Sequence, residues 1–307
     1  MFVRTEPAHV STIELGINRT PARVSFKKNA GQNNHFLITV LVGLDSVREG
    51  KAGLNDEFST SWSPKDVERS ALRSRDYALV TSLAWITDLI DVYRKRLQGM
   101  NSVFESAFSA KINAIEGRAN RLSGVASALD ISKTDSNLLL TLFAIKWRNT
   151  IVHSDAVTRV SSTLKAHLLN AADEISEAHR GMDVERSIAA FEQGHAPTFK
   201  EVASFISAAQ GLVQAFDAAA LAKMDIDKYA ESTLSAYFSH VFSKNTQVFS
   251  QFWPGNPSKS HQRLAKLLTQ CGFSEAPGIS QLSSDYLGAL ANLTARNARS
   301  RFSQPPT

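Results

Sequence analysis

The sequence predicts an all-α protein, a helical bundle with additional N- and C-terminal segments. Glycine (15) and proline (9) are scarce among the 307 residues, whereas alanine, leucine and serine are common. This composition favours long helices joined by short polar turns over a sheet of many strands. From residue 72 to residue 97, apolar side chains recur at spacings of seven, four, three, four, three and four. That periodicity predicts one stripe of a helix that packs nearly parallel to its neighbours. The stripe consists of Leu72, Leu79, Leu83, Ile86, Ile90, Tyr93 and Leu97.

The first 33 residues are expected to be irregular. Apolar residues alternate briefly in VSTIEL and ARVSF, which indicates two short strands, and Pro7, Pro21 and Gly31 interrupt any helical pattern. A first helix is predicted over residues 33–50. The clearest helix follows over residues 63–98, with Ser63 as its cap.

Further helices are predicted along the rest of the chain. They span residues 102–129, 136–153, 163–180, 183–193 and 198–224. Asp135 or Ser136 is the expected cap of the second of these, and Thr198 with Glu201 has the spacing of a capping box at the last. A linker is expected at 253–259, before two closing helices. The predicted domains are an N-terminal extension with one helix (1–62), a bundle (63–228) and a C-terminal helical region with a basic end (229–307).

The sequence favours a cytoplasmic location. Cys271 is the single cysteine, so an internal disulfide and a cysteine-based zinc site are excluded, and a reducing compartment fits. The first residues lack the pattern of a secretion signal, and no apolar run reaches the length of a membrane span. Neither secretion nor membrane insertion is expected.

Positive charge is concentrated in the last sixth of the chain. The formal net charge is +5, and residues 255–307 hold six lysines and arginines against two acidic residues. Such a segment can meet a phosphate backbone, although a solvated surface with surplus arginines is an equal alternative. The candidate RNA contacts are Lys146, Arg263, Arg296, Arg299 and Arg301.

One stretch, KWRNTIVHSDA at 146–156, combines residue types suited to work on a phosphodiester. Asn149 and His153 are four positions apart and share a helix face, and the long side chain of Arg148 can reach the same groove. A histidine can move the proton of a ribose 2′-hydroxyl, and an arginine can stabilise charge on the phosphorus oxygens. This chemistry needs neither metal nor cofactor, and the sequence shows no convincing metal-ligand spacing.

The run from Arg148 to His153 resembles the R-x4-6-H signature of HEPN domains, in which a polar residue, often asparagine, follows the arginine. The resemblance implies an all-α bundle over roughly 64–225 and a metal-independent endoribonuclease of a toxin–antitoxin or antiphage (abortive infection) system. It also implies Arg148 and His153 as the catalytic pair, with Asn149 as their polar companion. A homodimer in which two motifs line one cleft is expected, and an antitoxin or sensor subunit is a further possible partner.

Alternatives remain open from the sequence. A noncatalytic helical module could use the same groove to bind nucleotide, RNA or a protein, and an all-α scaffold would have no nucleic-acid role. His167 and His179, near acidic residues at 173–177, could form a metal patch, but a solvated helix face is favoured. Phe252 and Trp253 could stack bases, but anchoring to the core is favoured.

Overall fold

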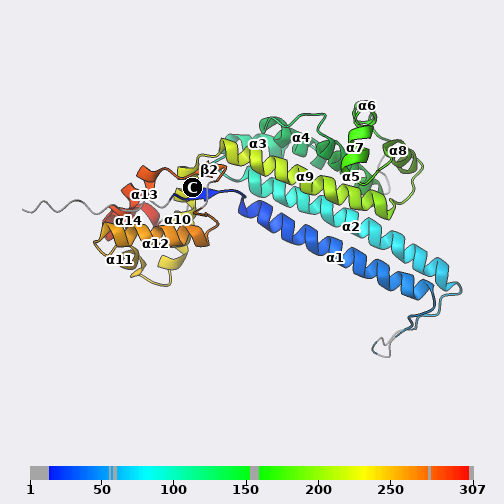
Figure 1. Cartoon of the computed structure of the whole chain (residues 1–307), viewed down its shortest axis with the longest axis horizontal. Helices are drawn as coiled ribbons and strands as arrows, with labels where there is room; N and C mark the ends of the chain where they lie inside the picture. Colours follow the sequence, from blue (N-terminus) through cyan, green and yellow to red (C-terminus); the bar gives the residue numbers. More distant parts are fainter. Residues whose placement is uncertain (1–13, 55–56, 58–60, 153–158, 276–277, 304–307) are drawn as a thin grey trace, which may run out of the picture. The chain divides into compact units, whose positions relative to one another are not determined.

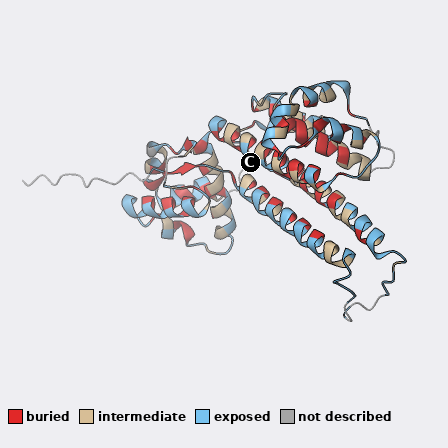
Figure 2. Cartoon of the chain, turned by 45° about the vertical axis from the view of Figure 1, so that its right-hand side comes forward, coloured by how far each residue is buried: buried red, intermediate tan, exposed pale blue. Residues whose placement is uncertain are grey.

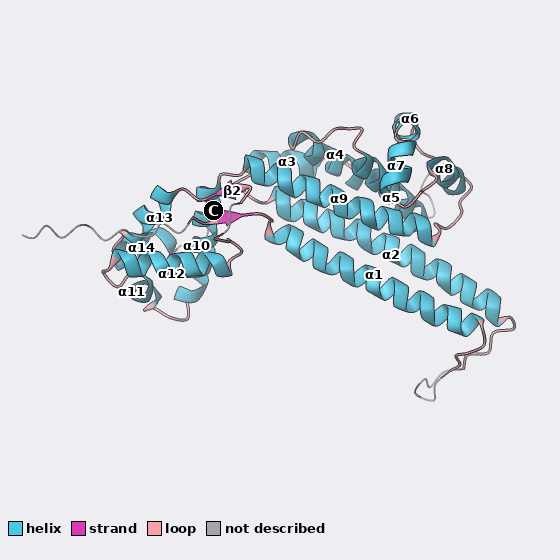
Figure 3. Cartoon of the chain, viewed as in Figure 1, coloured by secondary structure: helices cyan, strands magenta, loops and turns pink. Residues whose placement is uncertain are grey.

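The structure, a computed structural model, describes residues 14–54, 57, 61–152, 159–275 and 278–303. Fourteen helices and one two-stranded sheet account for the regular structure of these residues, which confirms the all-α prediction (Figure 3). The chain divides into two compact units. The large unit comprises Ala22–Gln98 and Ala107–Asp217, and the small unit comprises Met1–Pro21, Gly99–Ser106 and Ala218–Thr307.

The large unit is a helical bundle (Figure 1). Its helices are α1 (Pro21–Arg48), α2 (Val67–Gln98), α3 (Ser106–Ala114), α4 (Arg118–Ala128), α5 (Ser136–Val152), α6 (Ser162–Asn170), α7 (Ala172–Ala178), α8 (Val184–Glu192) and most of α9 (Phe199–Lys223). Helix α1 belongs almost entirely to the large unit, which begins at Ala22. The boundary that the sequence predicts near residue 62, between an N-terminal extension and the bundle, therefore does not coincide with a boundary between the two units.

Helix α1 starts earlier than the sequence predicts. The predicted strand ARVSF is the first turn and a half of this helix, because Pro21 occupies its first position, where a missing N–H costs nothing. Gly31 lies inside the helix and does not interrupt it. The predicted strand VSTIEL lies mostly outside the described residues.

Helices α1 and α2 lie side by side and run antiparallel (Figure 1). Asn33 of α1 donates to the carbonyl oxygen of Ser82 at 3.0 Å and accepts from the Ser82 hydroxyl at 3.0 Å. Away from this seam, α1 keeps a largely exposed surface that includes Phe36 and Val42 (Figure 2).

The apolar stripe of α2 is confirmed at every position except the first. Its members from residue 79 onward are at most 2% exposed, but Leu72 is 43% exposed, because at this turn the adjacent Ala71, which is 4% exposed, occupies the buried face. The predicted cap Ser63 is also wrong. The Asp66 carboxylate accepts from the Arg69 N–H at 2.9 Å, and α2 therefore begins at Val67.

Two predicted helices are each split in two. Gly117, with φ of 81°, separates α3 from α4, a backbone conformation that glycine adopts without strain. Ala171 separates α6 from α7. The first break gives α4 a helix start of its own at Arg118.

Helix α9 begins with the predicted capping box. The Thr198 N–H donates to Glu201 Oε2 at 2.6 Å, and the Glu201 N–H donates to Thr198 Oγ1 at 3.4 Å. Among the described residues, α9 is the one helix long and apolar enough to cross a membrane, and 56% of that apolar window is buried inside the protein.

Loss of the Thr198 hydroxyl should destabilise the protein modestly. Thr198→Ala leaves the Glu201 N–H without its acceptor, and the expected loss in the free energy of unfolding is about 1 kcal/mol. Urea denaturation of both proteins measures this difference. Thr39→Ala, at an exposed hydroxyl bonded only within its own helix, is the matched control. An unchanged unfolding midpoint in Thr198→Ala would show that the Thr198–Glu201 capping box does not stabilise the protein measurably.

The small unit brings together distant parts of the sequence. Strand β1 (Gly16–Ile17) pairs antiparallel with β2 (Ser280–Gln281), and the described part of the unit also contains the end of α9 and five complete helices. These are α10 (Ile226–Phe242), α11 (Val248–Phe252), α12 (Pro257–Gln270), α13 (Ser284–Ala291) and α14 (Ala295–Phe302). The predicted linker is shorter than expected, because Asn256 caps α12 through its side chain and the helix starts at Pro257. Three helices follow it in the described chain, where two were expected.

Trp253 belongs to the core of the small unit. It is 3% exposed, and its indole N–H donates to the carbonyl oxygen of Leu290 at 2.8 Å. Its ring stacks on Phe302, and Phe252 packs edge-on against Phe238. The anchoring alternative therefore holds, and the buried Trp253 ring is not available to stack on bases.

Candidate functional site

Helix α5, which carries the predicted motif, is fixed by buried aromatic packing. The Asp135 carboxylate caps it by accepting from the Leu138 N–H at 2.9 Å, as predicted. Phe143 and Trp147 are 0% and 1% exposed, and the Trp147 indole N–H donates to the carbonyl oxygen of His195 at 3.2 Å. These contacts set the rotation of α5 about its axis, so the side chains beside Trp147 have defined directions.

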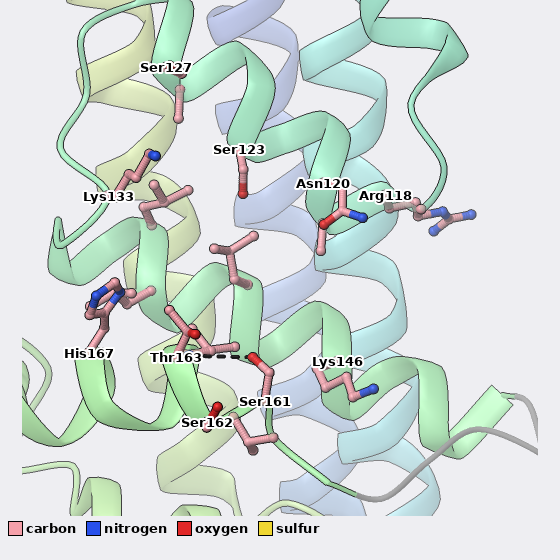
Figure 4. A pocket seen from close by; sticks show the side chains of 18 of the residues that line it. Arg118, Asn120, Ser123, Ser127, Lys133, Lys146, Ser161, Ser162, Thr163 and His167 are labelled. Carbon is pink, nitrogen blue, oxygen red and sulfur yellow. Dashed lines mark hydrogen bonds between the residues drawn. The ribbon is translucent and has the colours of Figure 1, made fainter.

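A second stripe of α5 forms one wall of a pocket. It consists of Leu138, Leu139, Leu142, Lys146 and Asn149, which recur at helical spacing. The pocket has a volume of about 910 Å³ and lies between this stripe, the side of α4 and the start of α6 (Figure 4). We call it the α4–α6 pocket. Its apolar part comes mainly from the leucines of α5, and its polar part comes from α4, α6 and the segments before α5 and α6.

The α4–α6 pocket is basic. Arg118, Lys133, Lys146 and Arg159 line it, and no aspartate or glutamate occurs among its described lining residues. Figure 4 shows Lys133 and His167 at one end and Lys146 at the other, with the hydroxyl of Ser123 between them, while the Arg118 guanidinium extends away from the other lining side chains. Arg118 is paired with Asp88, which lies outside the lining, so the positive potential that favours an anionic ligand comes mainly from Lys133, Lys146 and Arg159.

Two helix starts add to this potential. The first turns of α4 and α6 both contribute lining residues. Helix α4 follows Gly117, which offers no side chain as a cap, whereas the Ser161 hydroxyl accepts from the Leu164 N–H at 3.4 Å at the start of α6. The positive ends of two helix dipoles therefore supplement the lysines and arginines.

Arg148 lies beside the pocket and is not one of its lining residues. Its side chain is 13% exposed, and its Nη2 lies 3.5 Å from Asp88 Oδ1. Its Nη1 donates a long bond to Asn149 Oδ1 at 3.5 Å, and its buried Nε has no hydrogen-bond partner within the described part of the chain. Asp88 also pairs with Arg118. One carboxylate thus joins the motif arginine to a lining residue of the pocket.

The structure brings together one candidate RNA contact, Lys146, and two residues of the predicted catalytic set, Arg148 and Asn149. Lys146 and Asn149 line the same pocket, and Arg148 contacts Asn149. His153 lies outside the described residues. Asn149 before it and Arg159 after it in the sequence both line the α4–α6 pocket.

The remaining predicted RNA contacts belong to the small unit. Arg263 donates to the carbonyl oxygen of Gln251, and the Arg299 guanidinium lies 4.6 Å from the ring centroid of Phe242. Arg301 Nε pairs with Glu231 Oε1 at 2.6 Å, and Arg296 is exposed. Three of these four arginines therefore make contacts within their own unit, and none lines the α4–α6 pocket.

Sequence reasoning missed Asp88, Arg118, Lys133 and Arg159. They come from four separate segments, and no motif spacing connects them. One signal was available: Leu138, Leu142, Lys146 and Asn149 follow spacings of four, four and three, which mark a helix face that changes from apolar to polar.

For His167 and His179 the sequence favoured a solvated helix face over a metal patch, and the burial of His179 departs from the favoured reading. The described residues contain no group of three or more histidine, cysteine, aspartate or glutamate side chains that could hold a metal ion. His167 lines the α4–α6 pocket. His179 is instead 3% exposed, and neither ring nitrogen has a hydrogen-bond partner among the residues that the structure describes.

The buried ring of His179 should make stability depend on pH. Burial lowers its pKa below the ordinary value of histidine, and Asp135 and Glu174 only partly oppose this shift. The unfolded chain therefore binds the proton more readily, so this contribution is complete above the unfolded pKa and is lost as the pH falls. Urea unfolding from about pH 7 to about pH 5, where histidine titrates, should show a falling free energy of unfolding.

His179→Leu should flatten that dependence, because the variant has no proton to bind in either state. His240→Leu, at an exposed histidine, is the matched control and should retain the wild-type slope. Equal slopes for wild type and His179→Leu would show that other groups cause the pH dependence.

Comparisons with protein-family models, curated proteins and solved structures found no match for this chain.

Proposed function

We propose that this protein is a metal-independent endoribonuclease of HEPN type, with its site at the end of α5. One observation supports this most directly. Lys146 and Asn149, both from the KWRNTIVH stretch, line a basic pocket whose described lining residues include no carboxylate. A phosphodiester in this pocket would meet several cations and no lining side chain of its own charge.

The proposed reaction starts with attack of a ribose 2′-hydroxyl on the adjacent phosphorus. The oxygen–phosphorus bond forms, the bond to the 5′-oxygen of the next nucleotide breaks, and the products are a 2′,3′-cyclic phosphate and a 5′-hydroxyl. His153 takes the hydroxyl proton or gives one to the leaving oxygen. Arg148 stabilises the negative charge on the phosphorane. Asn149 holds the histidine ring or a phosphate oxygen.

Asp88 has a positioning role in this proposal. Its carboxylate holds the guanidinium of Arg148 within 3.5 Å and also pairs with Arg118 at the pocket. Because Asp88 is 49% exposed at its side chain, water screens these pairs, and an arriving phosphate can compete for both arginines.

The test uses the purified full-length chain with a mixed single-stranded RNA, the same sequence as DNA, and a chelator. RNA should be cut with and without chelator, and DNA should survive because it lacks the attacking hydroxyl. Mass spectrometry should find 2′,3′-cyclic phosphate ends. Intact RNA, or cleavage that stops in chelator, would refute the proposed activity.

The proposal includes a homodimer that joins two motifs. In the described chain α5 packs against α2, α4, α6 and α7, and its side chains through residue 145 are mostly buried. A second copy could therefore reach this helix only near its end, where the motif lies. A setting in a toxin–antitoxin or antiphage system, with an antitoxin or sensor subunit, rests on the resemblance alone.

Sedimentation should therefore detect a dimer at micromolar concentrations. Ile151→Arg, on the last turn of α5, should shift the equilibrium towards monomer by placing charge at the joined surfaces. Phe36→Arg, at an exposed position of α1, is the control. A protein that sediments only as a monomer and still cleaves RNA would contradict the dimer.

A second function, binding without cleavage, is favoured by the position of Arg148. Its guanidinium already pairs with Asp88, and it is not among the residues that line the pocket. A noncatalytic module would bind RNA with an affinity that falls as salt rises, and it would leave the RNA intact.

A further inference from the structure

We propose that the α4–α6 pocket holds one nucleotide of single-stranded RNA together with the phosphates on both of its sides. This inference deepens the proposed function, on which the choice of RNA rests. The shared chemistry is that of a nucleoside with a 5′-phosphate and a 3′-phosphate, whether free or within a chain.

The distribution of charge is the first argument. Lys133 and His167 lie at one end of the pocket, and Lys146 lies at the other, where Arg118 is held by Asp88 (Figure 4). A ligand with one phosphate would leave one end without an anion. A ligand with two phosphates separated by a nucleoside would place an anion at each end.

The surface between the two ends is the second argument. Leu138, Leu142 and Leu164 supply apolar contact for the flat face of a base or for a ribose. The side chains of Asn120, Ser123 and Thr163 supply hydrogen-bond donors and acceptors for base edges and a 2′-hydroxyl. The middle of the pocket therefore matches the nucleoside between two phosphates.

The size of the pocket agrees with this ligand. Its volume of about 910 Å³ lies near the upper end of the range of about 300–1,000 Å³ that is usual for small-molecule sites. A single nucleotide with both phosphates fits such a volume, whereas a duplex does not enter it.

The lining also determines how selective the pocket should be. The described lining residues include no phenylalanine, tyrosine or tryptophan, so a base meets leucine side chains without aromatic stacking. Binding should depend strongly on the two phosphates and weakly on the identity of the base.

The test measures binding of a fluorescent 2′-O-methyl RNA trinucleotide, which cannot be cleaved by the proposed mechanism. Competitors are a nucleoside 3′,5′-bisphosphate and the corresponding 5′-monophosphate. The bisphosphate should compete on the order of tenfold better than the monophosphate, because it reaches both charged ends. Trinucleotides with different central bases should bind within about threefold of one another, since stacking is missing.

Two variants test the two ends separately. Lys133→Gln and Lys146→Gln should each weaken trinucleotide binding and each lower the slope of log affinity against log salt by about one. Lys111→Gln is the matched control, because Lys111 is an exposed lysine of α3 that does not line the pocket. Circular dichroism and thermal unfolding confirm that each variant is folded.

The outcomes separate this inference from the proposed function. Wild-type binding by both end variants, in a protein that still cleaves RNA, would overturn the inference and leave the proposed ribonuclease intact. The expected binding pattern in a protein that never cleaves RNA would support the inference and refute the ribonuclease. Binding of the bisphosphate without any binding of the trinucleotide would assign the pocket to a free nucleotide and overturn the RNA assignment.

Discussion

His153→Ala should reduce the rate of RNA cleavage by a factor on the order of 10² to 10⁴, the usual contribution of a general acid–base group. The reason is chemical: alanine can neither accept the proton of the 2′-hydroxyl nor protonate the leaving oxygen. Single-turnover cleavage of a labelled RNA measures the chemical step, and binding of the uncleavable trinucleotide measures affinity separately. Affinity should remain close to that of wild type.

His240→Ala is the matched control, since His240 is an exposed histidine of the small unit. Arg148→Lys is a second test of the proposed catalytic site. A lysine can keep a charge near Asp88, but its ammonium cannot reproduce the planar fork, so cleavage should also fall severely. Equal cleavage by wild type, His153→Ala and Arg148→Lys would return the motif to a structural role.

Trp147→Ala should lower the free energy of unfolding by about 3–5 kcal/mol, the range for removing a large buried aromatic side chain. Its ring centroid lies 5.3 Å from that of Phe143, 5.7 Å from that of Phe191 and 5.9 Å from that of Phe205. Alanine would leave a cavity among these three rings and would leave the carbonyl oxygen of His195 without the indole donor. Urea denaturation followed by circular dichroism measures the loss.

Trp147→Phe keeps an aromatic ring but loses the indole N–H, so its loss should be clearly smaller. An unfolding midpoint of Trp147→Ala equal to that of wild type would contradict the packing described for α5. The comparison also separates stability from catalysis, because Trp147 and Arg148 are adjacent in sequence but point to different surroundings. Trp147→Ala should lose activity through unfolding, whereas Arg148→Lys should lose it while folded.

Local periodicity and capping chemistry account for what the sequence could predict about the fold. The buried stripe of α2, the Asp135 cap and the Thr198–Glu201 box all depend on residues within one or two helical turns of each other. The exposed side chain of Leu72 could not be predicted in the same way. Its position in the stripe is regular, but at this turn Ala71 is the buried residue, and which of two adjacent residues faces the bundle depends on tertiary packing.

The candidate site was only partly predictable for a related reason. Lys146 and Asn149 share a helix face, which spacing reveals. Asp88 contacts Arg118, which is 30 positions away in the sequence, and Arg148, which is 60 positions away. Only the packing of α2 against α4 and α5 brings these residues together. Local spacing in a single sequence does not predict contacts between charged residues that are this far apart in the chain.

The pairing of β1 with β2 determines the order in which the two units can be completed during synthesis on the ribosome. Asn18 accepts a hydrogen bond from the N–H of Ile279, a residue made 261 positions later. At a synthesis rate of about 5–20 residues per second, that interval lasts roughly 13 to 52 s. The large unit, whose segments end at Asp217, has all of its residues translated before β2 exists. Every residue of the candidate site is therefore translated before β2, the strand that pairs with β1 in the small unit.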